Sequence, residues 1–196
     1  LQHAMNEIFG DLPFVYVYID DLMVLTKGSF DTHLEALKIV MQRARRRKCQ
    51  INPAKSVFAG KEFKYLGFIL SVDGIRPDPA KVEAIQKLTT PKNRKQLQSF
   101  LGMMNYIRST VRNHAEVSAP LSSLTSAKVD YKWTEQHDEA FKKCKQAVIK
   151  ATMLSFPDFT KPFLIFTDAS KVAIGSVIFQ RNNDNTFKEP TAFFSK

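Results

Sequence analysis

The sequence has few of the residues that stabilise disulfide-rich or zinc-binding proteins. Its 196 residues include two cysteines, Cys49 and Cys144, which lie far apart in segments with helical patterns. No Cys/His spacing is typical of a zinc site, and two lone cysteines are typical of a reducing compartment. We therefore expect neither a disulfide framework nor a zinc site. The scattered histidines are interpreted as surface or helix-cap residues: His3, His33, His114 and His137.

Long apolar runs are also lacking. No segment approaches the roughly 20 apolar residues that a membrane-spanning helix needs, so no transmembrane helix is expected. The chain does not begin with methionine, and residues 1–7 lack the basic-then-apolar pattern of a signal peptide. We interpret the chain as a piece of a longer protein.

Acidic residues are outnumbered by basic ones. There are 19 Asp and Glu against 29 Lys and Arg, which gives a net charge of +10 and a pI of about 9.6. This excess favours polyanionic partners, nucleic acid first, although a generic basic protein would show the same balance. Hydrophobic residues make up 44% of the chain and include 16 Phe, which supports real cores. The length allows one large domain or two to three small ones.

The stretch from Phe14 to Leu25 is the most informative one. Six apolar residues lead into Asp20-Asp21, and four more follow. Such runs predict strands buried on both faces, joined in a tight hairpin at the aspartates. The pair could be a plain turn, since Asp tolerates turn conformations. Alternatively, two carboxylates on a rigid hairpin could hold divalent metal ions for phosphoryl chemistry.

Tyr18-Ile19-Asp20-Asp21 matches the Tyr-x-Asp-Asp signature of reverse transcriptases. The signature is only moderately specific by itself, and the order of the segments that follow makes it specific. These segments are Gln50-Ile51-Asn52-Pro53-Ala54-Lys55, Phe63-Lys64-Tyr65-Leu66-Gly67-Phe68, Gly74-Ile75-Arg76-Pro77-Asp78-Pro79, Phe100-Leu101-Gly102-Met103-Met104-Asn105-Tyr106 and Phe166-Thr167-Asp168-Ala169-Ser170. Over essentially its whole length, the chain closely resembles the Pol polyprotein of gypsy-class long-terminal-repeat retrotransposons.

The resemblance implies an α+β fold in four parts. Residues 1–75 would be the C-terminal part of a reverse transcriptase palm, with β-hairpins, a helix and the primer grip. Residues 76–130 would be the helical thumb, and residues 131–157 a connecting helix. Residues 158–196 would be the first strands of a truncated RNase H-like domain. The implied location is intracellular, in cytoplasmic virus-like particles, with the nucleus as a further compartment.

The resemblance also implies two-metal chemistry. Asp20 and Asp21 would bind the polymerase Mg²⁺ ions, with Mn²⁺ as an alternative, and Asp168 would bind RNase H Mg²⁺. One polymerase metal would activate the primer 3′-hydroxyl and the other would stabilise the leaving pyrophosphate. The family has a further palm aspartate upstream and further RNase H carboxylates downstream, and this chain lacks them. We therefore expect the chain alone to be inactive.

The implied partners are an RNA template, a DNA primer and, in the intact enzyme, a dNTP. The oligomeric state stays open. The residues expected to contact primer or nucleic acid are Tyr18, Ile19, Phe63, Tyr65, Leu66, Gly67, Lys92, Arg94, Lys95, Arg108 and Arg112. For any one of the thumb cations, a solvated basic face is an equal alternative. Gly67 would allow close approach of a ligand to the backbone.

Residue patterns predict the remaining elements. A helix over 31–48, capped by Asp31, should pack on the first hairpin through Leu34, Leu37, Val40, Met41 and Ala44. Strands are expected over 56–59 and 62–70, the second with Phe63, Tyr65, Gly67 and Ile69 on one face. A stiff linker is expected over 76–79, and a helix should begin at Asp78-Pro79.

Further helices should carry Leu97 to Val111, begin at Ala119 and begin at Thr134. The last of these should bury Ala140, Phe141, Cys144, Val148 and Ala151. Strands are expected over 163–168, 173–180 and 190–194, with a polar turn over 181–185. Trp133 could stack on a base or serve as a packing staple.

Two rival hypotheses stay open beside the enzyme fragment. The chain could be a non-catalytic, basic nucleic-acid-binding remnant of a retroelement, or a structural interaction domain. The basic run Arg43 to Lys48 bears on this point, because it could contact phosphate, act as a localisation signal or simply complement a helix C-terminus.

Overall fold

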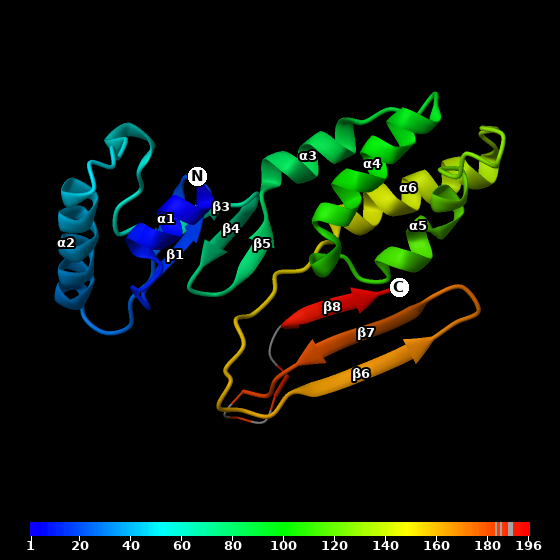
Figure 1. Ribbon diagram of the computed structural model, residues 1–196. Coiled ribbons are helices and arrows are strands. Elements are labelled where there is room, and N and C mark those ends of the chain that lie inside the picture. The colour runs from blue at the N-terminus through cyan, green and yellow to red at the C-terminus, as the bar shows by residue number, and fades with distance from the viewer. Residues whose placement is uncertain (183, 185, 188–189) are drawn as a thin grey trace. The chain divides into compact units, whose positions relative to one another are not determined.

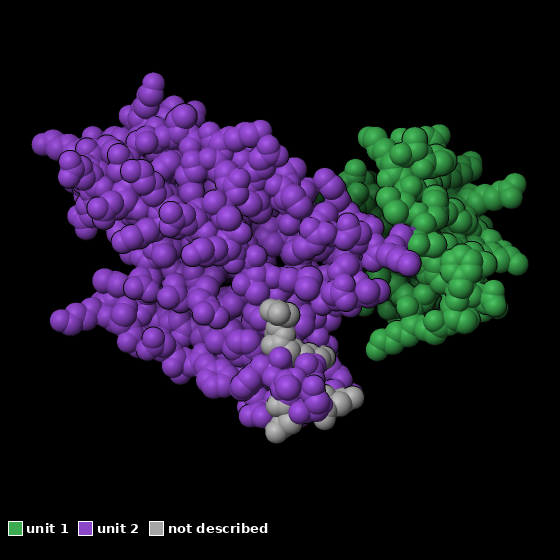
Figure 2. All heavy atoms as spheres, turned by 180° about the vertical axis from the view of Figure 1, so that it is seen from behind, with its two compact units in different colours: residues 1–59 green, residues 60–196 purple. Residues whose placement is uncertain are grey.

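The computed structural model describes residues 1–182, 184, 186–187 and 190–196. The polar turn predicted over 181–185 therefore lies partly outside the described residues. The chain divides into two compact units, residues 1–59 and residues 60–196 (Figure 2), and each unit is described by itself. Within the described ranges, no helix is both long and apolar enough to cross a membrane. The mixture of helices and small sheets agrees with the predicted α+β class.

The first unit contains a hairpin and two helices. Its elements are α1 (Gln2–Phe9), β1 (Val15–Tyr18), β2 (Asp21–Val24), α2 (Phe30–Arg46) and the short 3-10 helix η1 (Pro53–Lys55). The buried core contains residues of α1, β1 and α2 and of the loop after α1, and residues of β2 pack against it. It consists of Phe9, Leu12, Val15, Val40 and Ala44. The predicted packing of the helix on the hairpin is therefore confirmed.

The hairpin differs from the prediction in its burial. β1 and β2 pair antiparallel, with Val15 opposite Val24 and Tyr18 opposite Asp21. Val15 is buried, whereas Tyr16 and Tyr18 are 50% and 48% exposed. The prediction of strands buried on both faces was wrong for this chain, because side chains alternate between the two sides and α1 and α2 cover one of them.

The start of α2 also differs from the prediction. Ser29, not Asp31, is the N-cap, and its side chain accepts a hydrogen bond from the Thr32 N–H at 3.2 Å. Asp31 lies in the first turn, where a carboxylate still complements the helix dipole. Leu34 is 46% exposed although it has helical spacing, and Ala36 takes a buried position instead. Cys49 lies beyond the end of the helix and is free.

The second unit begins with a three-stranded antiparallel sheet. Its strands are β3 (Glu62–Tyr65), β4 (Phe68–Ser71) and β5 (Ile75–Pro77), in that order. Residues 56–59 form no strand, so that prediction was wrong. The predicted linker was wrong at its first two residues, because Arg76 and Pro77 belong to β5.

The predicted single strand over 62–70 is two strands joined by a turn at Leu66 and Gly67. The register pairs Phe63 with Leu70 and Lys64 with Ile69. Ile69 therefore shares a face with Lys64 and not with Phe63, so the predicted face assignment was wrong beyond Tyr65. The turn reverses the chain and changes which residues lie on each face.

Helices form the core of the second unit (Figure 1). They are α3 (Pro79–Lys87), α4 (Arg94–Tyr106), the 3-10 helix η2 (Arg108–Thr110), α5 (His114–Ser123) and α6 (Glu135–Ile149). The buried side chains are Ile85, Leu97, Phe100, Met104, Ile107, Val111, Leu121, Leu124, Ala140, Phe141, Cys144 and Val148. This confirms the predicted apolar faces of these segments, with Ala151 packed at the margin.

Two predicted helix starts are confirmed. Asp78 caps α3 by accepting from the Ala80 N–H at 3.0 Å. Thr134 precedes α6, and its N–H donates to His137 Nδ1 at 3.1 Å. The predicted start at Ala119 was wrong, because α5 begins at His114 and carries Pro120 inside it.

Trp133 packs within its own unit. Its Nε1–H donates to the Asp138 carboxylate at 2.7 Å, and its ring lies edge-on to Phe141 with centroids 6.1 Å apart. These contacts favour the packing role over base stacking. Cys144 lies on the buried face of α6, and this burial raises the pKa of its thiol to about 12.

The chain ends in a second antiparallel sheet, as predicted. Its order is β6 (Leu164–Ala169), β7 (Ile174–Phe179) and β8 (Ala192–Ser195). The segment that leads from α6 to this sheet pairs with β5 through one residue, Leu154. Ile75 and Leu154 exchange backbone hydrogen bonds of 2.8 and 2.7 Å in an isolated antiparallel bridge.

A matched pair of glycine substitutions tests this fold. Gly67 has a φ of +68°, and a side chain there would meet Lys81 and Tyr106, whereas Gly102 lies inside α4 with open space around it. Gly67→Ala should therefore lower the free energy of unfolding by about 1–2 kcal/mol. Gly102→Ala should raise it by about 0.5–1 kcal/mol. Urea denaturation of both variants measures the difference. Equal changes in the free energy of unfolding would contradict the positive φ of Gly67 in the turn.

Candidate nucleic-acid and metal site

The tip of the first hairpin holds the two predicted aspartates. Ile19 adopts the left-handed region with φ +55°, and Asp21 is the first residue of β2. Gln2 of α1 supports this turn, because its Oε1 accepts from the Ile19 N–H at 2.5 Å and its Nε2 donates to the Val17 carbonyl at 3.3 Å. Sequence analysis missed Gln2, since only folding brings α1 next to the tip.

Both carboxylates at the tip are exposed. Asp20 lies in the turn and Asp21 pairs with Tyr18, so two neighbouring residues offer oxygen ligands at the same end of the hairpin. Hard divalent cations prefer such ligands. Nevertheless, the described parts of the chain contain no group of three or more His, Cys, Asp or Glu side chains that could hold a metal ion. The residues present therefore fit only part of a metal site.

The predicted primer-grip residues surround the β3–β4 turn. Leu66 and Gly67 have φ values of +45° and +68°. Both residues are half-buried. Phe63 and Tyr65 lie on the same face of β3 and lead into this turn. The side chains of Lys81 and Tyr106 lie close to Gly67. They occupy part of the space through which a ligand was predicted to approach this glycine.

The predicted thumb cations fall into two groups. Lys92, Lys95 and Arg108 are exposed, and their side chains take part in no ion pair within the described ranges. Arg94 instead donates to the carbonyls of Leu124 and Val129, at 3.4 and 2.5 Å. Its role in the unit is at least partly structural.

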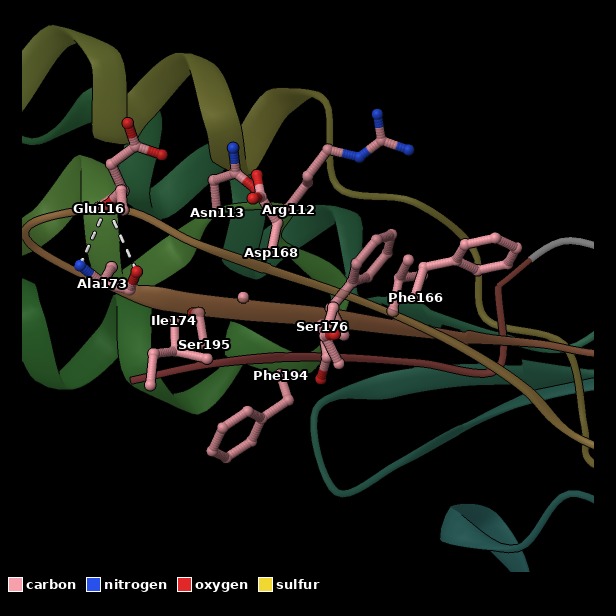
Figure 3. A pocket seen from close by; sticks show the side chains of 15 residues that line it. Arg112, Asn113, Glu116, Phe166, Asp168, Ala173, Ile174, Ser176, Phe194 and Ser195 are labelled. Carbon is pink, nitrogen blue, oxygen red and sulfur yellow. Dashed lines mark hydrogen bonds between the residues drawn. The ribbon is translucent and has the colours of Figure 1, made fainter.

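Arg112, the fifth cation, lies with Asp168 in the lining of a pocket of about 190 Å³ (Figure 3). Its guanidinium carbon is 5.8 Å from the Phe193 ring centroid. Asp168 lies opposite Gly175 in the β6–β7 register and accepts from the Ala169 N–H at 2.9 Å. In Figure 3 its side chain points from β6 toward the start of α5, near Asn113.

The start of α5 supplies the other wall of this pocket. Glu116 brings a second carboxylate, and Ser195 Oγ of β8 accepts from the Ala115 N–H at 3.0 Å. The sequence did not predict a role for Glu116 or Ser195, because the residue patterns of α5 and β8 do not indicate that these two elements are in contact. Asp168 and Glu116 offer oxygen ligands, but they do not complete a set of three.

His114 is buried beside this wall, contrary to the prediction of a surface or cap residue. Its Nε2 lacks a hydrogen-bond partner among the described residues. Burial lowers the pKa of its imidazole, and the nearby charge of Arg108 lowers it further. A backbone hydrogen bond to Met104 acts in the opposite direction.

Two protein families match this chain. Residues 1–70 match the reverse transcriptase (RNA-dependent DNA polymerase) family, and residues 133–196 match the RNase H-like domain found in reverse transcriptase. The first match contains the hairpin tip and the β3–β4 turn, and the second contains Asp168.

Curated relatives are transposon polyproteins. The chain is 37% identical to the retrovirus-related Pol polyprotein from transposon opus of Drosophila melanogaster, over 92% of this chain and 19% of the relative. It is 32% identical to the transposon Tf2-3 polyprotein of Schizosaccharomyces pombe, over 99% of this chain and 15% of the relative. The chain thus spans a fifth or less of the length of these relatives.

Solved structures of a foamy viral protease-reverse transcriptase share the fold. The complex with dsDNA has a TM-score of 0.85 and 25% identity, over 99% of this chain and 40% of that chain. The complex with an RNA/DNA hybrid has a TM-score of 0.80 and 25% identity, over 99% of this chain and 26% of that chain.

The burial of His114 predicts a pH dependence of stability. In the unfolded chain its imidazole takes up a proton near pH 6.5, whereas the folded protein resists protonation because the folded pKa is lowered. The free energy of unfolding should therefore fall as the pH drops from about 6.5 through the folded pKa, by at most about 1.4 kcal/mol per pH unit. Urea denaturation across this pH range measures the fall.

His114→Leu should remove this part of the pH dependence, whereas His3→Leu, at an exposed position, should keep it. NMR titration of His114 should also show a raised pKa in Arg108→Gln. An unchanged pH profile in His114→Leu would contradict the assignment.

Proposed function

Since the chain belongs to the reverse transcriptase family and carries at residues 133–196 an RNase H-like domain found in reverse transcriptases, we propose that it serves RNA-directed DNA synthesis within a gypsy-class retrotransposon Pol polyprotein. In this role it spans the late palm, the thumb, a connecting helix and the start of the RNase H domain, with the boundaries predicted from the sequence. The observation that carries the proposal is the Tyr18-Ile19-Asp20-Asp21 turn at the tip of a packed hairpin.

The proposed role of Asp20 and Asp21 is to supply carboxylate ligands to Mg²⁺, with Mn²⁺ as an alternative. The support is their exposure at the end of a rigid hairpin, where hard cations can reach two oxygen donors. Because the described residues do not complete a metal site, we assign no reaction step to this chain alone. We propose that other segments of the polyprotein complete the ligand set.

The proposed substrates are an RNA template with a DNA primer and, in the intact enzyme, a dNTP. The solved relatives bound to dsDNA and to an RNA/DNA hybrid support a duplex partner. The net charge of +10 favours the same partner. Within the chain, we assign primer contacts to Tyr18, Ile19 and the β3–β4 turn, and phosphate contacts to the exposed cations Lys92, Lys95 and Arg108. Arg94 and Arg112 are weaker candidates, since the unit already uses both side chains.

Asp168 is proposed as an RNase H metal ligand. Its support is its place at the end of β6, in a pocket wide enough to admit solvent and ions. For this carboxylate too, the described residues supply an incomplete ligand set. The proposed location is cytoplasmic, in virus-like particles, with access to the nucleus.

A non-catalytic nucleic-acid-binding role is the second candidate. The incomplete metal sites favour it for the isolated chain, because binding to a phosphate backbone needs cations and no metal. Duplex binding and chemistry are therefore tested separately.

Duplex binding should depend on salt. The chain should bind an RNA–DNA hybrid with little sequence preference, and its affinity should fall linearly with salt on a double-logarithmic plot, because lysine and arginine release counterions. The triple variant Lys92→Gln, Lys95→Gln, Arg108→Gln should reduce the slope by about 0.9 for each cation that contacts a phosphate. Fluorescence anisotropy at several salt concentrations measures the slopes.

The matched control removes the same charge at three exposed lysines, Lys142 and Lys143 of α6 and Lys150 at its C-cap, as Lys142→Gln, Lys143→Gln, Lys150→Gln. If the two triple variants reduced the salt slope equally, the net charge and not the position of the thumb cations would determine binding. A flat salt dependence of the wild type would contradict duplex binding through phosphates.

The isolated chain should not extend a primer, because its described residues gather too few carboxylates around either metal position. The test is primer extension on an RNA template with Mg²⁺ or Mn²⁺, comparing residues 1–196 with a version extended upstream. The extended version should be active and should lose its activity in Asp20→Ala. Template-dependent extension by residues 1–196, abolished by Asp20→Ala, would show that the site is complete without other segments.

A further inference from the structure

The β3–β4 turn has a backbone that its sequence does not favour. Leu66 and Gly67 both have positive φ, +45° and +68°. Two consecutive residues of this kind form the tight hairpin turn that usually carries Asn-Gly or Asp-Gly. A leucine at the first position is strained, because its Cβ crowds the backbone in the left-handed region. Something outside the hairpin must therefore hold the turn.

Tyr106, the last residue of α4, contacts the turn directly. Its hydroxyl donates a hydrogen bond to the Leu66 carbonyl, which belongs to the strained residue itself. Its ring stacks on Phe68, the residue after the turn, with centroids 5.7 Å apart and planes at 20°. One side chain thus touches the turn on both sides of Gly67.

Residues at the start of α3 complete the support. Lys81 Nζ lies 4.7 Å from the centroid of the Tyr106 ring, and the Lys81 stem packs against Gly67. The Asp78 N–H donates to the Gly67 carbonyl at 3.1 Å, and the Asp78 carboxylate pairs with Lys64 at 3.2 Å. The carbonyls of both turn residues are therefore bonded to the helical part of the unit.

We propose that Tyr106 is a positioning residue, which fixes the Leu66–Gly67 turn in its strained conformation so that the turn can hold a primer end. This inference rests on the proposed function of the turn. Strain that is maintained by specific contacts is typical of functional sites. Here Tyr106 is 48% exposed, so its hydroxyl adds little to core burial and its main contacts are to the turn.

Tyr106→Phe removes the hydroxyl and keeps the ring. Tyr131→Phe is a matched control, because the Tyr131 hydroxyl also donates to a backbone carbonyl 40 residues earlier, that of Pro91, at 2.7 Å. Hydrogen exchange of the free protein tests the support itself. In Tyr106→Phe the amides of Phe68 and Asp78 should exchange roughly threefold to tenfold faster, the factor that one neutral hydrogen bond contributes.

A nucleic-acid measurement tests the role. An RNA–DNA hybrid with a recessed primer carries 2-aminopurine at the primer 3′ end, and a second hybrid carries it well inside the duplex. The wild-type chain should change the fluorescence of the terminal probe more than that of the internal probe. Tyr106→Phe should keep the affinity for the hybrid but lose the terminal signal, whereas Tyr131→Phe should keep both.

The two measurements separate the possible failures. Unchanged exchange in Tyr106→Phe, or faster exchange of the same amides in Tyr131→Phe, would overturn the role of Tyr106 in holding the turn. An unchanged terminal signal despite faster exchange would overturn its role in positioning the primer. If the wild type does not distinguish the two probes, the proposed function of the turn is wrong, and the exchange result still decides whether Tyr106 holds the turn.

Discussion

The packing of α4, α5 and α6 around Phe100 and Phe141 is the constraint on which both candidate regions of the second unit depend. The centroids of the two rings are 4.6 Å apart, and both side chains are almost fully buried. Burial of each side chain contributes about 1.5–3 kcal/mol to the stability of the fold. α4 ends at Tyr106, beside the β3–β4 turn, and α5 begins at the wall of the Asp168 pocket. A change in this core would move both regions, although neither includes Phe100 or Phe141.

The hairpin of the first unit follows the same logic on a smaller scale. Its buried residues anchor one face of the hairpin on α1 and α2, and its exposed end carries the charged residues. Gln2 connects the two parts, because it belongs to a helix of the core and bonds to the backbone of the turn. A packed core can thus fix the direction of side chains that are exposed to solvent.

Local signals in the sequence predicted the fold well wherever one short segment decides the outcome. The Asp78 and Thr134 caps, the apolar stripe of α4 and the last three strands are of this kind. The prediction failed at Leu66 and Gly67, because leucine is rarely found where the backbone needs a positive φ, and a single glycine in an apolar run did not indicate a turn. His114 and Gln2 were missed for a similar reason, since their surroundings come from residues distant in sequence.

The bridge between Ile75 and Leu154 has a consequence for the behaviour of the chain in solution. β5 is the last strand of its sheet, and a free strand edge is a template for pairing with other molecules. Leu154 takes up the backbone donor and acceptor of Ile75 on that outer side. The passing segment therefore blocks edge-to-edge pairing with another molecule at this position of β5.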